Sequence, residues 1–156
     1  MIERLSGRLC SQLSQVLAEL QARSYESIGI RSWSASEIEE LTASSHVHII
    51  MARDRQGSAQ GFLCLSLLDH EAEVLSLAVD PNHWRQGVAS LLFESLKTDQ
   101  KFAETGRLVL EVSENNTSAT VLYRKLGFVD IAMRRNYYRI DGNRIDARVM
   151  ERYYPR

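Results

Sequence analysis

Two junctions between a strand and a helix constrain the fold of this chain more than any other feature. The first contains Arg85-Gln86-Gly87-Val88-Ala89-Ser90, and the second begins at Asn116 and ends at Gly127-Phe128. The segments before them end at Val79 and Val112 and have the composition of buried strands, whereas the segments after them repeat apolar residues at helical spacing. This alternation indicates a sheet with helices packed on its faces.

Periodicity predicts the other elements. Apolar residues recur every three to four positions from Ile2 to Leu20, which predicts one amphipathic helix over most of the first twenty-odd residues. A second helix is expected over 34–43, where the acidic residues suit a helix N-terminus better than a catalytic carboxylate group. The later elements are expected as strands over 47–53, 60–68 and 73–79, a helix from Val88 to Ala103, a strand over 107–112, a helix around 119–126 and a closing hairpin that turns at Asp141-Gly142.

These elements predict the α/β (α+β) class, with one mixed, mostly antiparallel twisted sheet that carries helices on both faces. The chain has 156 residues, which suits a single domain spanning 1–156. A domain of that size buries roughly 70% of the surface of its unfolded chain. We therefore expect a self-sufficient core. A monomer is the expected oligomeric state.

Composition excludes several classes of function. The chain is 44% hydrophobic and 25% charged with a formal net charge of −1, which favours neither nucleic acid nor membrane as a partner. The longest apolar run, 61–68, is far shorter than the ~20 residues that cross a bilayer, so a cytoplasmic location is expected. Cys10 and Cys64 are isolated and the four histidines are scattered, so no metal site is expected.

One segment has an uneven charge. Seven arginines lie between Arg134 and Arg156 against three acidic residues, an excess of four positive charges. Such a segment attracts an acidic ligand or ribosomal RNA. The solvated face of a strand is the alternative, because Ile145, Ala147 and Val149 alternate with charged residues.

The first junction has the properties of an anion-binding turn. Several N–H donors must converge on a phosphate at a helix N-terminus, and a residue without a β-carbon is needed where the backbone comes closest. Gly87 is such a residue, Ala89 is small, and Arg85 adds a positive charge. A plain strand-to-helix turn explains these residues equally well until their place after Leu77-Ala78-Val79-Asp80-Pro81 is considered.

A family resemblance rests on six blocks between about residues 24 and 151. They are Ser76 to Pro81, Arg85-Gln86-Gly87, Leu110-Glu111-Val112, Asn116 to Phe128, Arg134-Arg135-Asn136-Tyr137-Tyr138, and Asp146-Ala147. Their order and spacing resemble the GNAT superfamily of N-acetyltransferases, and within it the RimI type, which acetylates the N-terminal alanine of a small-subunit ribosomal protein. Trp84 departs from the pattern, because the family usually has Gln or Arg there.

The resemblance implies that acetyl-CoA binds where two strands splay apart, here those ending at Val79 and Val112. The backbone of Leu77, Ala78 and Val79 would contact its acetyl and pantetheine end. Asn116 would hold the pantetheine arm, although capping of a helix is an alternative role and both can hold. The pyrophosphate would be surrounded by N–H groups of Arg85, Gln86, Gly87, Val88, Ala89 and Ser90.

The resemblance also implies Glu111 as general base and Tyr123 as general acid, with the Val79 N–H on the thioester carbonyl. A phenol with pKa near 10 can protonate a thiolate near 8.5. Packing alone also explains Tyr123, and pairing with an arginine also explains Glu111. No Cys or Ser lies beside a base as a nucleophile, so direct transfer in a ternary complex is expected.

For the acceptor, Tyr137 and Tyr138 match the residues that wall the peptide groove of N-terminal acetyltransferases, although they also suit a strand. An α-amine is neutral roughly 400 times more often than a lysine amine at pH 7. The expected partner is the N-terminal peptide of an alanine-initiated small-subunit ribosomal protein. Two alternatives remain open: an acetyltransferase for small amines, and a non-catalytic acyl-CoA-binding protein, which Trp84 suggests.

Overall fold

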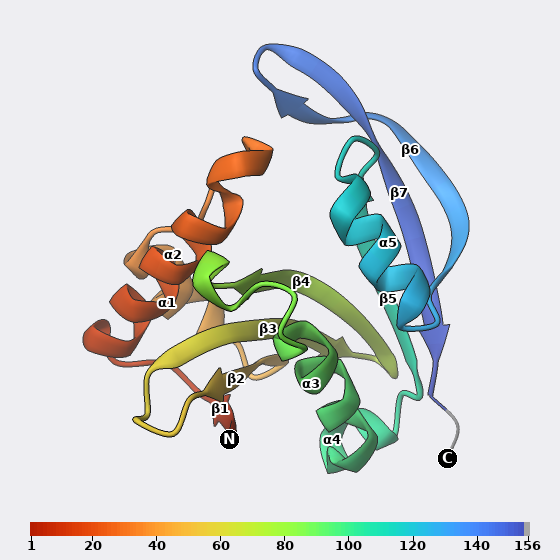
Figure 1. Ribbon diagram of the computed structural model, residues 1–156. Coiled ribbons are helices and arrows are strands. Elements are labelled where there is room, and N and C mark those ends of the chain that lie inside the picture. The colour runs from red at the N-terminus through yellow and green to blue at the C-terminus, as the bar shows by residue number, and fades with distance from the viewer. Residues whose placement is uncertain (155–156) are drawn as a thin grey trace.

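A seven-stranded sheet forms the centre of the molecule in the computed structural model, which describes residues 1–154 (Figure 1). Arg156, counted above among the basic residues, lies outside this part of the chain. The strand order is β1-β2-β3-β4-β5-β7-β6, and all neighbours are antiparallel except β4 and β5. The strands are β1 (Ile2–Ser6), β2 (Val47–Arg53), β3 (Ala59–Leu68), β4 (Glu71–Val79), β5 (Arg107–Ser113), β6 (Val129–Ile140) and β7 (Asn143–Tyr153). The predicted mixed, mostly antiparallel sheet is confirmed.

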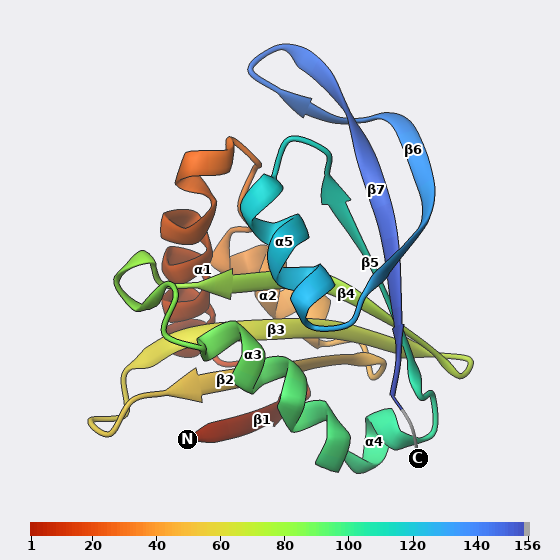
Figure 2. The ribbon, with the colours of Figure 1, turned by 45° about the vertical axis from the view of Figure 1, so that its right-hand side comes forward.

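Helices cover both faces of this sheet and define two core layers (Figure 2). On one face lie α1 (Ser11–Tyr25) and α2 (Ala35–Thr42), and on the other α3 (Val88–Glu94), α4 (Gln100–Ala103) and α5 (Thr117–Lys125). Strand β3 serves both layers, because alternate side chains of a strand point to opposite faces. Phe62 and Cys64 pack beneath α1, while Leu63 and Leu65 pack beneath α3. Among the described residues, no helix is long and apolar enough to cross a membrane.

The N-terminal helix differs from the prediction, which is wrong for its first residues. Residues Ile2–Ser6 form β1, whose Ile2 lies opposite Ala52 of β2. The helix begins only at Ser11, after Gly7 has turned the chain with φ +80°. Five residues carry too little periodicity to separate strand from helix, and pairing with the edge of β2 decides between them.

The start of α2 confirms the interpretation of the acidic residues as a helix N-terminus. The Ser34 hydroxyl accepts the Glu37 N–H at 3.1 Å, and the Glu37 carboxylate accepts the Ser34 N–H at 2.9 Å. This reciprocal capping box satisfies two donors that a helix N-terminus otherwise leaves without partners.

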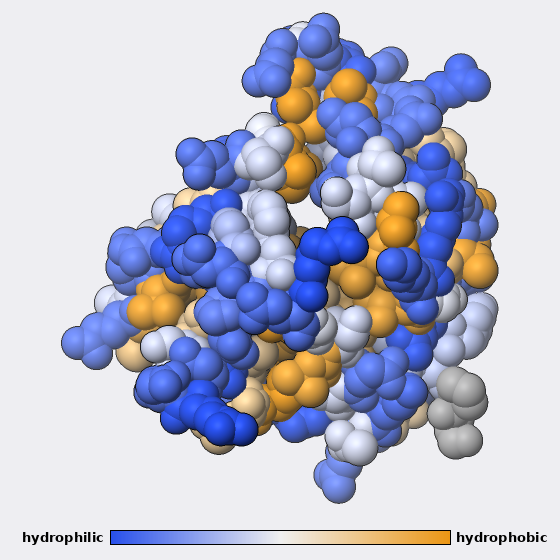
Figure 3. All heavy atoms as spheres, viewed as in Figure 1, coloured by the Kyte–Doolittle hydropathy of each residue, from blue (hydrophilic) through white to orange (hydrophobic). Residues whose placement is uncertain are grey.

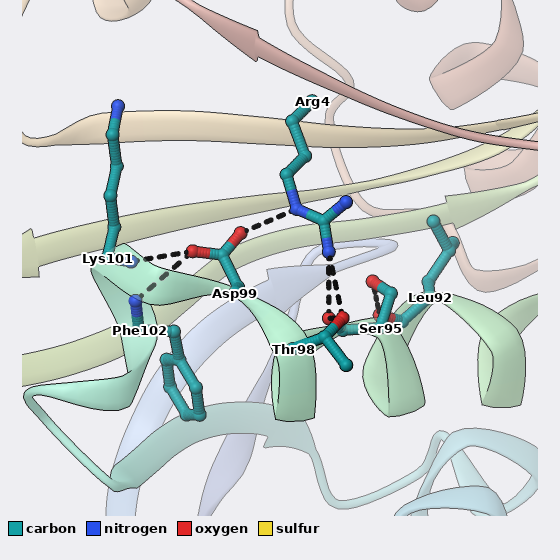
Figure 4. Close-up of polar contacts among 7 residues, drawn as sticks. All are labelled: Arg4, Leu92, Ser95, Thr98, Asp99, Lys101 and Phe102. Carbon is teal, nitrogen blue, oxygen red and sulfur yellow. Dashed lines mark hydrogen bonds and ion pairs between the residues drawn. The ribbon is translucent and has the colours of Figure 1, made fainter.

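The segment after Gly87 is not one continuous helix to Ala103, as predicted, but α3, a short 3-10 turn and α4. The break is at Asp99, whose backbone is extended and whose carboxylate caps two N–H groups of α4. The same carboxylate accepts a 2.9 Å hydrogen bond from Arg4 of β1, which also binds the Ser95 carbonyl (Figure 4). Asp99 therefore ends one helical segment, begins the next and ties both to the edge of the sheet.

A β-bulge in β4 opens the sheet at its centre. Leu65 lies opposite Val74 and Cys64 lies opposite Ser76, so that Leu75 has no partner in β3. A bulge bends its strand and increases the local twist. The parallel pairing of β4 with β5 is limited to Ala72 with Leu108 and Glu73 with Val109, although the two strands continue to Val79 and Ser113. The predicted splay between these two strands is confirmed.

Candidate active site

A cavity of about 740 Å³ lies where β4 and β5 separate. Because the splay interrupts the sheet, this cavity reaches the layers on both of its faces. Gln21, Ser24 and Tyr25 of α1 line one side, and Ala119 and Tyr123 of α5 line the other. The surface is hollowed near its middle in Figure 3, below the tip of the β6–β7 hairpin.

The glycine turn forms one end of this cavity with its backbone donors unused. Gly87 has φ +82° and Arg85 has φ +60°, so the chain takes the left-handed region twice in three residues. Within residues 1–154, none of the N–H groups of residues 85–90 donates a hydrogen bond to the protein. Gln86 is the exception to the expected set: its side chain binds the Asn82 carbonyl at 3.0 Å and it does not line the cavity. The cavity wall includes Arg85, Gly87, Val88, Ala89 and Ser90.

Both backbone groups of Val79 are bound at the end of β4. The indole N–H of Trp84 donates to the Val79 carbonyl at 2.7 Å, so this donor ties the turn to the strand and is not available to an anion. The Val79 N–H donates to Ser24 Oγ at 3.3 Å. Leu77 and Val79 line the cavity, whereas the fully buried Ala78 packs in the layer beneath α1.

Asp80 holds the end of β4 and the start of the turn against α1. Its Oδ2 accepts from Arg23 Nη2 at 2.8 Å, and its Oδ1 accepts the Asn82 N–H at 2.9 Å. Burial acts to raise the pKa of Asp80, but these hydrogen bonds and the charge of Arg23 outweigh it and leave the pKa below its usual value. One carboxylate therefore caps the start of the turn and fixes it to α1.

Glu111 lies in β5 and lines the cavity, while its neighbours Leu110 and Val112 pack in the core beneath α5. Its Oε1 accepts a hydrogen bond from Arg134 Nη1 at 2.7 Å, so the predicted alternative of an ion pair with an arginine is present. Glu73 of β4 lies close enough to Glu111 for the two charges to interact. Burial first, and then the negative charge of Glu111, raise the pKa of Glu73. Glu111 thus lies at the cavity wall with Arg134 bound to it and with Glu73 nearby.

Tyr123 reaches the cavity from α5, on the other face of the sheet. Its ring makes edge-to-face contacts with Phe93 and Phe128 at centroid distances of 6.1 and 5.8 Å, which confirms the packing alternative as a contact. The side chain is only 8% exposed, and burial raises the pKa of its phenol, with the nearby Tyr25 and Tyr138 adding to the effect. No group among residues 1–154 hydrogen-bonds its hydroxyl. A protonated phenol therefore faces the cavity.

Asn116 caps α5, as the alternative role predicted. Its Oδ1 accepts the Ala119 N–H at 3.2 Å. The side chain also lines the cavity, and its amide N–H₂ has no acceptor in the described part of the chain. Capping uses the oxygen of this amide and leaves the nitrogen as a donor, so the two predicted roles are compatible.

The two hairpin tyrosines occupy different positions. Tyr138 lines the cavity, and its hydroxyl donates a long, 3.5 Å hydrogen bond to the Glu111 carbonyl. Burial, followed by the charge of Glu111, raises the pKa of Tyr138 to about 12. Tyr137 is 47% exposed and lies outside the cavity wall, where its ring packs edge-on against Tyr138 and beneath Arg134. Of the two tyrosines, Tyr138 lines the cavity and Tyr137 lies beside it.

Sequence reasoning missed a polar group on α1. The Tyr25 hydroxyl lies 2.7 Å from Ser76 Oγ, to which Gln21 Nε2 donates at 2.8 Å. Burial raises the pKa of Tyr25. The available signal was the spacing of Gln21, Ser24 and Tyr25, which share one helix face at i, i+3 and i+4. Gln21 is buried, and Ser24 and Tyr25 are half-buried. These three residues line the cavity from the side of α1.

The chain matches the model of the acetyltransferase (GNAT) family over residues 14–128. The N-alpha-acetyltransferase RimI of Mycobacterium tuberculosis is 34% identical over 150 residues, which are 94% of this chain and 90% of that protein. The ribosomal protein bS18-alanine N-acetyltransferase of Escherichia coli K12 is 35% identical over 96 residues, which are 62% of this chain and 65% of the relative.

Structural comparison agrees with these sequence matches. The crystal structure of the ribosomal-protein-S18-alanine N-acetyltransferase from Escherichia coli superimposes with a TM-score of 0.81 and 26% identity, covering 100% of this chain and 96% of that one. Ard1 from Thermoplasma volcanium shares the fold with a TM-score of 0.76 at 23% identity. From the family match and the extent of these similarities, the chain belongs to the GNAT family of acetyltransferases.

Proposed function

We propose that this protein transfers the acetyl group of acetyl-CoA to the α-amine of a protein N-terminus, namely that of an alanine-initiated small-subunit ribosomal protein. One observation carries the proposal. Glu111 and Tyr123 reach the same cavity from opposite faces of the sheet, between the unused N–H groups of the glycine turn and the hydroxyl of Tyr138. A base, an acid and an anion-binding turn thus surround one space.

The residues present fit acetyl-CoA. The N–H groups of residues 87–90 suit a pyrophosphate, because they end at a helix N-terminus and have no acceptor within the described chain. Gly87 is needed for its φ of +82° and not for space, since a β-carbon there would meet no atom within 4 Å. The amide nitrogen of Asn116 and the backbone of 77–79 suit the amides of the pantetheine arm. When bound, acetyl-CoA supplies an acetyl group activated as a thioester.

The protein groups account for the movement of protons. Glu111 takes a proton from the acceptor ammonium, directly or through a water, so that the neutral amine can form the new C–N bond. Tyr123 stays protonated because burial raises its pKa, and its hydroxyl gives a proton to the departing thiolate. The Val79 N–H stabilises the negative charge that develops on the oxygen of the thioester carbonyl. To do so, this oxygen has to replace Ser24 Oγ, which accepts the same N–H in the structure.

The acceptor assignment rests on chemistry and on similarity. An α-amine has a pKa near 7.8, so about one molecule in seven is already neutral at pH 7, and the ammonium form holds its proton far less tightly than a lysine does. Tyr138 projects from the hairpin into the end of the cavity beside Glu111, where an acceptor would enter. The relatives described above are named as N-terminal or alanine N-acetyltransferases, which supports a peptide α-amine over a small amine.

Release of free CoA thiol tests the proposal. The protein is incubated with acetyl-CoA and peptides copied from ribosomal protein N-termini, alongside polyamines and aminoglycosides. We expect turnover of alanine-initiated peptides and none of the small amines. Turnover of small amines alone would identify the alternative acetyltransferase, and inactivity with every amine despite binding of acetyl-CoA would identify a non-catalytic binding protein.

Two substitutions test the assigned roles. Glu111→Gln and Tyr123→Phe should each lower kcat by about 10²- to 10⁴-fold, because each removes a group that moves a proton. The affinity for acetyl-CoA, measured by calorimetry, should stay unchanged. Glu114→Gln and Tyr153→Phe make the same chemical changes at exposed positions and serve as controls. Normal kcat in either test variant contradicts the role assigned to that residue.

A further inference from the structure

An arginine outside the cavity holds the carboxylate that lines it. The Arg134 side chain is 52% exposed, while that of Glu111 is 18% exposed. Glu111 belongs to the cavity wall and Arg134 does not. The guanidinium therefore approaches Glu111 from the outer side, and the carboxylate lies between it and the cavity.

The ion pair involves only one oxygen of the carboxylate. Arg134 Nη1 donates to Glu111 Oε1 at 2.7 Å. Among residues 1–154, this is the one hydrogen bond within 3.5 Å of the carboxylate. The Tyr137 hydroxyl also lies near Glu111: burial first, and then the charge of Glu111 and a hydrogen bond to its side chain, raise the pKa of Tyr137. A hydrogen bond to one oxygen restricts rotation of the carboxylate and leaves the lone pairs of the second oxygen for another donor.

Arg134 is itself held in place by Tyr137. Its guanidinium carbon lies 4.1 Å from the centroid of the Tyr137 ring, which packs edge-on against Tyr138 at 5.2 Å. Positions three apart in a regular strand point to opposite faces, so this stacking needs an irregular strand. The register of β6 and β7 shifts between Arg134 and Tyr138, and Asn136 takes φ +55° with its N–H bound to Asp146 Oδ1 at 2.8 Å. The bulge brings the ring beneath the guanidinium.

We propose that Arg134, stacked on Tyr137, is a positioning residue that orients Glu111 so that Oε2 faces the amine of the acceptor. This inference rests on the proposed function and adds the group that orients the base. It also changes the role of Tyr137, which acts through Arg134 and not on the peptide. Enzyme sites that activate a nucleophile usually contain a base and a third group that orients the base. Here the acceptor amine is the nucleophile, Glu111 is the base and Arg134 is the orienting group.

A matched pair of variants tests the proposal. Arg134→Gln and Arg135→Gln remove the same charge from adjacent exposed residues, but only the first contacts Glu111. Arg134→Gln should lower kcat roughly 10- to 100-fold, as expected when a catalytic group loses its orientation, with the KM for acetyl-CoA unchanged. Arg135→Gln should stay within about twofold of the wild type, as a surface change does. Equal effects of the two variants would overturn the proposal.

Two further measurements separate positioning from a structural role. Ethylguanidinium in solution should restore part of the kcat of Arg134→Ala and should not affect Glu111→Gln, whereas no rescue would count against the proposal. In a double-mutant cycle, Arg134→Gln added to Glu111→Gln should have little further effect, because both substitutions disable one unit. Additive losses would show that Arg134 acts independently of Glu111.

The stacking is tested at Tyr137. Tyr137→Phe keeps the ring and should keep most of kcat, while Tyr137→Leu should lower it about threefold to tenfold, since a cation–π contact at an exposed site is weak. Equal losses in both variants would assign the effect to the hydroxyl and contradict the stacking. If the wild type acetylates no amine, the proposed function fails; if it does so and Arg134→Gln matches Arg135→Gln, only this inference fails.

Discussion

The strands on the two sides of the splay differ in how they are supported. The body, β1 to β4, is paired along its length and covered by helices on both faces, so that Phe62 and Leu63 are fully buried in opposite layers. The arm, β5 to β7, ends in an edge strand in which nine of the first ten residues are exposed. Two residue pairs of parallel ladder join the body to the arm.

The cavity of the candidate active site lies at the join between the two parts. The body fixes the glycine turn through Asp80 and Trp84, whereas the arm carries Glu111, Arg134 and Tyr138. In the proposed function, the cavity between the two parts holds acetyl-CoA against the body and the acceptor against the arm. Substitutions should therefore cost much stability in the body and little in the arm.

Phe62→Ala removes a fully buried ring from the body. We expect a loss of about 3–5 kcal/mol in the free energy of unfolding, because a cavity remains where the ring packed. Urea denaturation monitored by circular dichroism measures it. A loss below 1 kcal/mol would show that the layer beneath α1 is not a close-packed core.

Asp80→Asn weakens the attachment of the turn to the body. At pH 7 it should lower the free energy of unfolding by about 1–3 kcal/mol, since it breaks a charge-assisted hydrogen bond with Arg23. The pKa of Asp80 is lowered in the folded state, so its contribution is present above the unfolded pKa near 3.9 and is lost as pH falls through the lower folded value.

The difference between wild type and Asp80→Asn should therefore shrink when unfolding is measured at pH 3 in place of pH 7. Asp141→Asn, at the exposed turn of the hairpin, is the control and should match the wild type at both pH values. A difference that grows toward pH 3 would mean that the folded state raises the pKa of Asp80.

Val129→Thr changes the arm, where the residue is 58% exposed at the start of β6. We expect a change within about 0.5 kcal/mol, as for other surface substitutions. The same urea experiment measures it. A loss approaching that of Phe62→Ala would show that another molecule or segment covers the arm in solution.

Local signals in the sequence predicted much of the fold. The bounds of β2 match the prediction, and the hairpin turn, the start of α2 and the Asn116 cap all depend on neighbouring residues. The splay followed from family resemblance and not from periodicity. Strand β1 was missed because its structure depends on pairing with β2, some fifty residues away.

The site was predictable to a similar extent. Sequence blocks brought Glu111, Tyr123 and Asn116 to one cavity, but not the contacts that decide how each side chain is held. Arg134, which binds Glu111, lies 23 residues further along the chain. The indole N–H of Trp84 donates to the Val79 carbonyl. The spacing of apolar residues predicts neither contact, because each depends on an irregularity in a strand or turn.

The unpaired Leu75 has a consequence for which side chains can reach the cavity. Before it, the even-numbered Ala72 and Val74 pack toward α3 and α5; after it, the odd-numbered Leu77 and Val79 do so, and Ala78 packs beneath α1. Removing this one residue would exchange the two sets without altering any side chain. The number of residues in β4 therefore determines which side chains face the cavity. A substitution in β4 would change one of these side chains, whereas an insertion or deletion would bring a different set to the cavity.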